Sequence, residues 1–196
     1  PRPSVLLLDE PFASLDIELR EQIARELRQI LKHDGITTIM VSHNQLEAFA
    51  MADVIGVMNE GKLLQWDTAF DLYHEPKTAV VADFVGEGVF ISGEVINDKE
   101  VKTEIGVIQS TVAHETGAGT KVRVLLRPDD ILHDDDSNMT ARVTDKAFRG
   151  AEFLCTLELE SGLRVLSLVP SHHDHPMDEP IGIRLEIDHL VIFPER

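Results

Sequence analysis

The chain has 196 residues, of which 18 are basic and 35 are acidic, so its formal net charge is −17. This length suffices for one large or two small domains, and a hydrophobic content of 43% allows a packed core. The acidity argues against a general basic surface for nucleic acid or anionic lipid, and a single cysteine, Cys155, excludes a disulfide framework.

The first predicted element is a strand. Four apolar residues, 5–8, run directly into Asp9 and Glu10, and Pro11 stops the run. An unbroken apolar run predicts a strand buried on both faces, as in a parallel sheet. Open α/β sheets bind ligands at such strand ends, so the two acids either meet a cation or activated water or form a solvated turn. Because parallel strands need neighbours, we expect the chain to be a fragment lacking an upstream half.

An amphipathic helix is predicted over residues 17–33, capped by Ser14 or Asp16 and ended by Gly35. Its apolar side chains recur every three or four positions: Leu19, Ile23, Leu27, Ile30 and Leu31. Its charged side chains are expected to point elsewhere: Glu18, Arg20, Glu21, Arg25 and Arg28.

The pattern continues as mixed α/β to about Gly86. A β-branched strand is predicted over residues 36–41, followed by Ser42, His43 and a helix over 44–52. The further predicted elements are strands 54–58 and 62–66, joined by a turn at 59–61, and helices 68–73 and 78–85, separated by Pro76.

Short strands without helical periodicity follow Gly86. They are predicted at residues 89–96, 122–126, 141–147, 153–159, 164–169 and 183–187. Such spacing favours a small β-barrel or sandwich. The predicted fold class is therefore α/β followed by all-β, with domains over residues 1–86 and 87–196.

Four polar residues are candidates for chemistry: Asp9, Glu10, Asp16 and His43. If strands 5–9 and 36–41 are parallel, a right-handed crossover places their ends on one sheet edge, where Asp9 and Glu10 meet His43. One carboxylate can hold Mg²⁺ through water, its neighbour can accept a proton from water, and a histidine can donate to phosphate oxygens. This grouping suits phosphoryl transfer, although a lone histidine is more often a capping or core residue.

Residues 6–11 followed by Ser14, Leu15 and Asp16 resemble the Walker B motif and D-loop of ABC transporter ATPases, which are P-loop NTPases with a RecA-like sheet. Val41, Ser42 and His43, followed by Glu47 and Ala48, resemble their H-loop. Asn44 departs from the acid that the family usually has there.

The resemblance implies roles for five residues. Asp9 would serve Mg²⁺ through water, Glu10 would be the general base or water-positioning carboxylate, and His43 would contact the γ-phosphate. Asp16 and Ser42 would contribute to ATP binding, with Asp16 at the interface of an ATP-sandwich dimer.

The second half resembles the C-terminal regulatory domains of importer ATPases. Residues 125–131 are similar to the R-P-E/D stretch of their TOBE domains, which are OB-like barrels. Residues 84–90 and 190–194 look most like ferric-iron import ATPases. The resemblance implies a homodimer with ATP and Mg²⁺ on the cytoplasmic face of the inner membrane. Its implied partners are permease subunits and, indirectly, a periplasmic substrate-binding protein, without nucleic acid.

The sequence contains neither a Walker A phosphate loop nor an L-S-G-G-Q signature. We therefore expect the chain alone neither to bind ATP tightly nor to hydrolyse it, because the triphosphate lacks its main cradle. Two alternatives stay open. The chain could be a non-catalytic regulatory or dimerisation module, or the ATPase could serve another cargo such as polyamine, sulfate or sugar.

Other features are given structural interpretations. The histidine-rich tract at residues 171–175 is expected to be an exposed loop rather than a metal site, and residues 134–136 a solvated acidic loop. Trp66 is expected in a core or interface, and Cys155 in a core.

Overall fold

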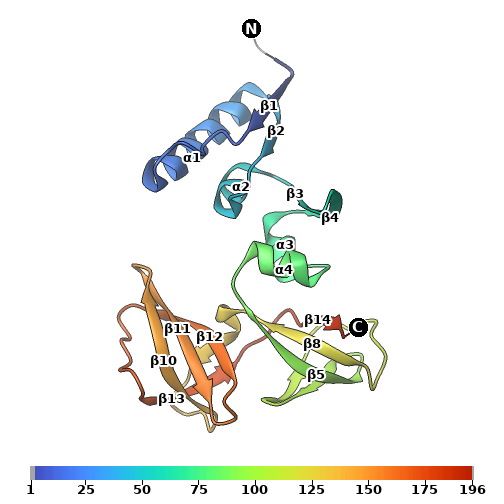
Figure 1. Cartoon of the computed structure of the whole chain (residues 1–196), viewed down its shortest axis with the longest axis vertical. Coiled ribbons are helices and arrows are strands. Elements are labelled where there is room, and N and C mark those ends of the chain that lie inside the picture. The colour runs from blue at the N-terminus through green and yellow to red at the C-terminus, as the bar shows by residue number, and fades with distance from the viewer. Residues whose placement is uncertain (1–2, 196) are drawn as a thin grey trace. The chain divides into compact units, whose positions relative to one another are not determined.

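The computed structural model describes residues 3–195, except for the side chains of residues 17, 18 and 21, so the expected orientations of Glu18 and Glu21 lie outside it. The chain divides into two compact units, unit 1 ending at Val85 and unit 2 beginning at Gly86. Unit 1 is mixed α/β and unit 2 consists of antiparallel sheets (Figure 1), which confirms the expected fold class at this level. Within the described range, no helix combines the length and apolarity needed to cross a bilayer.

Unit 1 begins with a parallel strand–helix–strand motif. β1 (Val5–Asp9) and β2 (Thr37–Val41) pair in parallel, and α1 (Ile17–Asp34) connects them. Of the two candidate caps, Asp16 is used, because its carboxylate accepts a hydrogen bond from a first-turn backbone N–H at 2.9 Å. Gly35 ends the helix in the left-handed conformation with φ 66°, as predicted.

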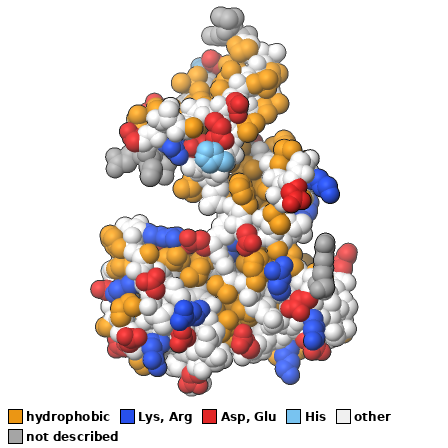
Figure 2. All heavy atoms as spheres, viewed as in Figure 1, with side chains coloured by type: hydrophobic (Ala, Val, Ile, Leu, Met, Phe, Trp, Pro, Cys, Tyr) orange, Lys and Arg blue, Asp and Glu red, His pale blue; other side chains and the backbone are white. Residues whose placement is uncertain are grey.

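Among the residues that the structure describes, side chains cover one face of this motif and leave the other exposed. A cluster under α1 buries four side chains, Phe12, Ala24, Leu31 and Met51. The alternate residues of the strands are exposed on the other face: Val5 by 49%, Leu7 by 71%, Ile39 by 58% and Val41 by 58%. Figure 2 shows hydrophobic side chains at the surface of unit 1. The expectation that β1 is buried on both faces is wrong for the described residues, because α1 covers one side of the pair.

The buried stripe of α1 is rotated from the predicted one. Leu19 and Ile30 are exposed, by 41% and 58%, and lie at the margins of the stripe. Positions 24, 27 and 31 form its centre, and the helical repeat continues this line back through position 20. The prediction that Arg20 points away is therefore wrong, since its side chain is only 20% exposed.

The rest of unit 1 holds a hairpin and three short helices. Their bounds are α2 (Gln45–Met51), β3 (Ile55–Asn59), β4 (Lys62–Asp67), α3 (Ala69–His74) and α4 (Ala79–Val85). Gly61 takes φ 75° in the hairpin turn, as predicted. Trp66 is 59% exposed, so of its two expected places the core is wrong and the interface stays a prediction. Its ring instead lies over the cross-strand Gly56, which has no side chain to hold it away.

Unit 2 contains two five-stranded antiparallel sheets, in the orders β14-β8-β5-β6-β7 and β12-β11-β10-β13-β9. The first sheet comprises β5 (Val89–Asn97), β6 (Glu100–Thr103), β7 (Gly106–Gln109), β8 (Lys121–Leu126) and β14 (Val191–Pro194). The second comprises β9 (Ile131–His133), β10 (Thr140–Phe148), β11 (Glu152–Leu159), β12 (Arg164–Pro170) and β13 (Pro180–Leu185). A 3₁₀ turn, η1 (Pro128–Asp130), joins β8 to β9.

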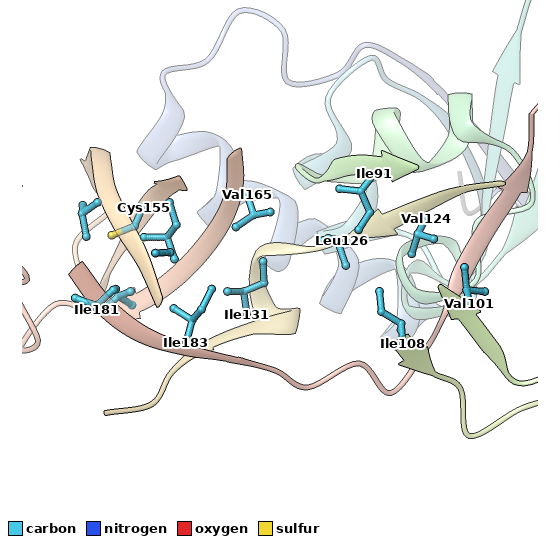
Figure 3. Close-up of a cluster of buried hydrophobic side chains, with 14 of the residues drawn as sticks. Ile91, Val101, Ile108, Val124, Leu126, Ile131, Cys155, Val165, Ile181 and Ile183 are labelled. Carbon is cyan, nitrogen blue, oxygen red and sulfur yellow. The ribbon is translucent and has the colours of Figure 1, made fainter. Parts of the chain in front are cut away.

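One hydrophobic cluster is shared by both sheets. It contains Ile91 and Val124 from the first sheet and Val165 and Ile183 from the second, which are labelled in Figure 3. Cys155 is 3% exposed within it, which confirms its expected place in a core. Buried residues alternate along β12 and along the first part of β8, so each of these strands turns one apolar face to the cluster.

Four strands of unit 2 were not predicted: β6, β7, β9 and β14. Each has only three or four residues, too few for a period-two pattern to emerge from the sequence. The last predicted strand, residues 183–187, begins three residues earlier and ends two residues earlier, at Pro180–Leu185. A proline can begin a strand because its missing N–H is needed least there.

At Gly182 in β13, the neighbouring backbone leaves no room for a side chain. A Cβ at this position would lie 2.1 Å from the backbone oxygen of Asp134, whose N–H also donates to the Gly182 oxygen at 2.9 Å. We predict that Gly182→Ala destabilises unit 2 by at least about 2 kcal/mol, because a backbone atom must move. Urea unfolding measures the loss. Gly117→Ala is the control, since a Cβ at Gly117 meets nothing within 4 Å. Equal stability of the two variants would contradict the prediction.

Candidate functional site

The carboxyl ends of β1 and β2 lie opposite one another at the same edge of the sheet. Asp9 pairs with Val41 in the parallel register, and the backbone N–H of Glu10 donates to the Val41 oxygen at 2.9 Å. Glu10 then takes a left-handed backbone conformation, φ 45°, which turns the chain sharply at the strand end. The two residues that follow the strands, Glu10 and Ser42, therefore begin their loops at the same sheet edge.

Glu10 and His43 are in direct contact at this edge. Glu10 Oε1 accepts a hydrogen bond from the His43 backbone N–H at 3.1 Å and lies 2.8 Å from His43 Nδ1. An ionised carboxylate can only accept, so Nδ1 carries the proton in this contact. The imidazole is 78% exposed, whereas Glu10 Oε2 is shielded from solvent and has no hydrogen-bond partner in the described part of the chain.

The other three predicted site residues are placed differently. Asp9 is exposed at the strand end, and the described residues offer its carboxylate no hydrogen bond. The Asp16 carboxylate caps α1. The Ser42 hydroxyl donates to Glu47 Oε2 at 2.5 Å. The structure thus brings Glu10 and His43 together, places Asp9 beside them in the chain, and engages Asp16 and Ser42 in local contacts; the roles of all five remain predictions.

A buried ion pair behind this edge was not predicted. Arg20 Nη1 lies 3.4 Å from Glu47 Oε1, and Glu47 is only 4% exposed. Arg20 Nη2 also donates to the Leu15 backbone oxygen at 2.9 Å. The sequence did contain a signal, because position 20 continues the line of the buried positions 24 and 31 and the partly buried position 27 in α1.

Asn44 caps the helix that follows His43. Its side-chain oxygen accepts hydrogen bonds from the backbone N–H groups of Leu46 at 2.9 Å and Glu47 at 3.3 Å. Asparagine and aspartate are about equally good caps, so the departure from an acid at this position leaves the local structure intact.

The Arg-Pro-Asp stretch forms a buried link in unit 2. Arg127 is 5% exposed, and its Nη1 donates to the backbone oxygens of Gly86 at 2.7 Å and Glu87 at 3.1 Å. Asp130 Oδ2 accepts from the Arg127 backbone N–H at 2.7 Å. Burial raises the pKa of the Asp130 carboxyl to about 7, although this hydrogen bond opposes the shift.

The Asp130 pKa predicts a pH dependence of stability. Folded Asp130 holds its proton to about pH 7, whereas unfolded aspartate loses it near 3.8, so the stabilisation present below pH 4 is lost as pH rises to 7. We predict that Asp130→Asn gains, relative to wild type, about 2–4 kcal/mol of unfolding free energy between pH 4 and pH 8.

Urea unfolding at a series of pH values measures this difference. Asp98→Asn, at an exposed turn, is the control and should follow the wild-type profile. Parallel profiles for Asp130→Asn and wild type would refute the assignment.

Histidines of the 171–175 tract lie near β9. The ring centroids of His133 and His175 are 4.3 Å apart, and those of His133 and His173 are 6.4 Å apart. Burial and then the neighbouring histidines lower the pKa of His175. Among the described residues, no group of three or more metal-binding side chains has an arrangement that could hold an ion.

Comparison with known proteins supports the importer resemblance. Residues 124–193 match the TOBE domain family. The chain is 38% identical to the spermidine/putrescine import ATP-binding protein PotA of Vibrio cholerae serotype O1, over 95% of this chain and 52% of that protein. It is also 38% identical to PotA of Bacteroides thetaiotaomicron, over 92% of this chain and 39% of that protein.

The chain thus spans about half the length of the Vibrio relatives that it matches. These relatives are named for the import of the polyamines spermidine and putrescine. The expectation that the transported cargo is ferric iron is therefore not supported. A solved structure of the molybdate-binding protein ModG aligns with 53% of this chain and 94% of its own at 15% identity and a TM-score of 0.46, too weak a likeness to indicate a shared fold.

Proposed function

We propose that the chain is the C-terminal part of the ATP-hydrolysing subunit of an ABC importer. The observation that carries the proposal is the contact of Glu10 with His43 at one sheet edge, across 33 positions of sequence. The similarity to import ATP-binding proteins over 95% of the chain and the TOBE match support it independently. Unit 1 would then be part of a RecA-like nucleotide-binding domain, and unit 2 an OB-like regulatory domain.

The residues at the sheet edge suit ATP and Mg²⁺. Asp9 is exposed where a hydrated cation could reach it, and the neighbouring Glu10 carboxylate, 34% exposed as a side chain, could accept a proton from water. When bound, ATP would supply the phosphoryl group that is transferred, and Mg²⁺ would neutralise the negative charge of the phosphates. His43 Nδ1 lies 2.8 Å from Glu10 Oε1, a contact that orients the exposed ring, and an imidazolium with both nitrogens protonated could then donate from Nε2 to a phosphate oxygen. Asp16 and Ser42 would hold the loops on either side.

The proposed partners follow from this class of subunit. Two copies would form a homodimer, with Asp16 at its interface, and would bind permease subunits at the cytoplasmic face of the cell membrane. A periplasmic substrate-binding protein would act through the permease, and nucleic acid would take no part. The net charge of −17 favours attachment through protein partners over direct attraction to anionic lipid.

Removing the Glu10 carboxylate should stop turnover of the full-length protein. We predict that Glu10→Gln lowers the rate of ATP hydrolysis about 100- to 1,000-fold, because glutamine cannot accept a proton from water, while ATP affinity is retained. Phosphate release and nucleotide binding measure the two quantities. Glu60→Gln, in the exposed β3–β4 turn, is the control. A normal rate for Glu10→Gln would show that the role proposed for Glu10 is wrong.

The proposed cargo is a polyamine, spermidine or putrescine, as the names of the relatives indicate. We predict that deleting the gene lowers uptake of labelled spermidine and that the full-length gene restores it, whereas the Glu10→Gln gene does not. Uptake of ferric iron, sulfate and sugar is the comparison, and it should be unchanged. Loss of ferric-iron uptake with normal spermidine uptake would overturn the cargo assignment.

A further inference from the structure

We propose that Arg20 and Glu47 are positioning residues that fix the loop before α1 and the His43 loop in one arrangement. The inference rests on the proposed function, because the two loops matter only if they face a nucleotide. Neither residue contacts the Glu10–His43 pair in the described structure, so each would act through its neighbours.

The first step is that one ion pair reaches both loops. Arg20 Nη2 donates to the oxygen of Leu15, the residue immediately before Asp16, at 2.9 Å. Arg20 Nη1 lies 3.4 Å from Glu47 Oε1. At the other end of the pair, Glu47 Oε2 accepts a hydrogen bond at 2.5 Å from the hydroxyl of Ser42, the residue immediately before His43.

The second step is that the network holds the His43 backbone from both sides. The Ser42 hydroxyl donates to Glu47 and also accepts from the Asn44 backbone N–H at 3.0 Å. Ser42 and Asn44 flank His43, whose own N–H donates to Glu10 Oε1. The direction of the His43 N–H therefore depends on where Glu47 holds Ser42.

The third step is burial. Glu47 is 4% exposed and Arg20 is 20% exposed, so each charge depends on its partner for stabilisation. Arg28 on the same helix provides a contrast. Its ion pair with Asp53, at 2.9 Å, joins side chains that are 34% and 60% exposed and touches neither loop. Surface pairs of this kind contribute little, so the buried pair is the one placed to control loop geometry.

The test uses the full-length protein with Arg20→Met, Glu47→Gln and the double variant. We expect each single change to lower kcat about 10- to 100-fold, the effect of a misplaced group, with KM for ATP within about threefold of wild type. Because the two residues act as one unit, the double variant should lose no more than about threefold beyond the worse single variant. Arg28→Met is the matched control and should keep kcat within about twofold.

A second readout does not depend on activity. Hydrogen exchange of the segment with residues 42–46 should become faster in Glu47→Gln and in the milder Ser42→Ala, and stay unchanged in Arg28→Met. Ser42→Ala keeps the Arg20–Glu47 ion pair and removes only the link of this pair to the His43 loop. The test can therefore rest on this variant if the others fold poorly.

Three results would overturn the inference: an unchanged kcat in Glu47→Gln, additive losses in the double variant, or a loss fully accounted for by unfolded protein. If the wild-type protein hydrolyses no ATP, the proposed function fails. Exchange in the 42–46 segment then still decides whether Glu47 positions the His43 loop.

Discussion

The parallel pairing of β1 with β2 is the constraint on which the candidate site depends. Its register puts Asp9 opposite Val41, and the hydrogen bond from Glu10 to Val41 extends the pairing one residue further. A shift of one residue would move every side chain to the other face and separate Glu10 from His43. α1 maintains the register by burying Leu31 and its neighbours against one side of the strands, so sheet packing and site geometry have the same cause.

A second constraint is electrostatic. Unit 1 places a charged pair, Arg20 and Glu47, within the stripe of α1 that otherwise packs hydrophobic side chains. A buried pair is costly to desolvate and is no evidence of stability by itself. The pair instead orients the two loops, because guanidinium and carboxylate groups bind at defined angles. Arg20 contacts Leu15 in one loop, and Glu47 contacts Ser42 in the other.

Much of this architecture could be predicted from the sequence. The period of α1, its cap at Asp16 and its end at Gly35 are local properties, and all three are observed. The meeting of Glu10 and His43 could be anticipated because the handedness of a strand–helix–strand crossover is nearly invariant. The TOBE resemblance of residues 125–131 agrees with the domain match over residues 124–193.

Other features depend on contacts that a sequence pattern does not contain. The exposure of Leu7 and Ile39 reflects which faces the described chain covers, and a hydrophobic run looks the same with one face covered or two. The position of Arg20 was missed because charge was taken to imply exposure, although the helical repeat placed it in the stripe. The four short strands of unit 2 are defined by their neighbours, since three or four residues carry too little pattern of their own.

The most direct test of the account is a crystal structure of the full-length protein with Mg²⁺ and a non-hydrolysable ATP analogue. The account predicts that the terminal phosphate lies against His43 at the carboxyl end of β1, with the metal's water shell at Asp9. It also predicts that the contacts of Arg20 with Leu15 and of Glu47 with Ser42 remain in place. A nucleotide bound away from this edge, or a Glu10 carboxylate far from its terminal phosphate, would contradict the claim that these strands form half of a nucleotide site.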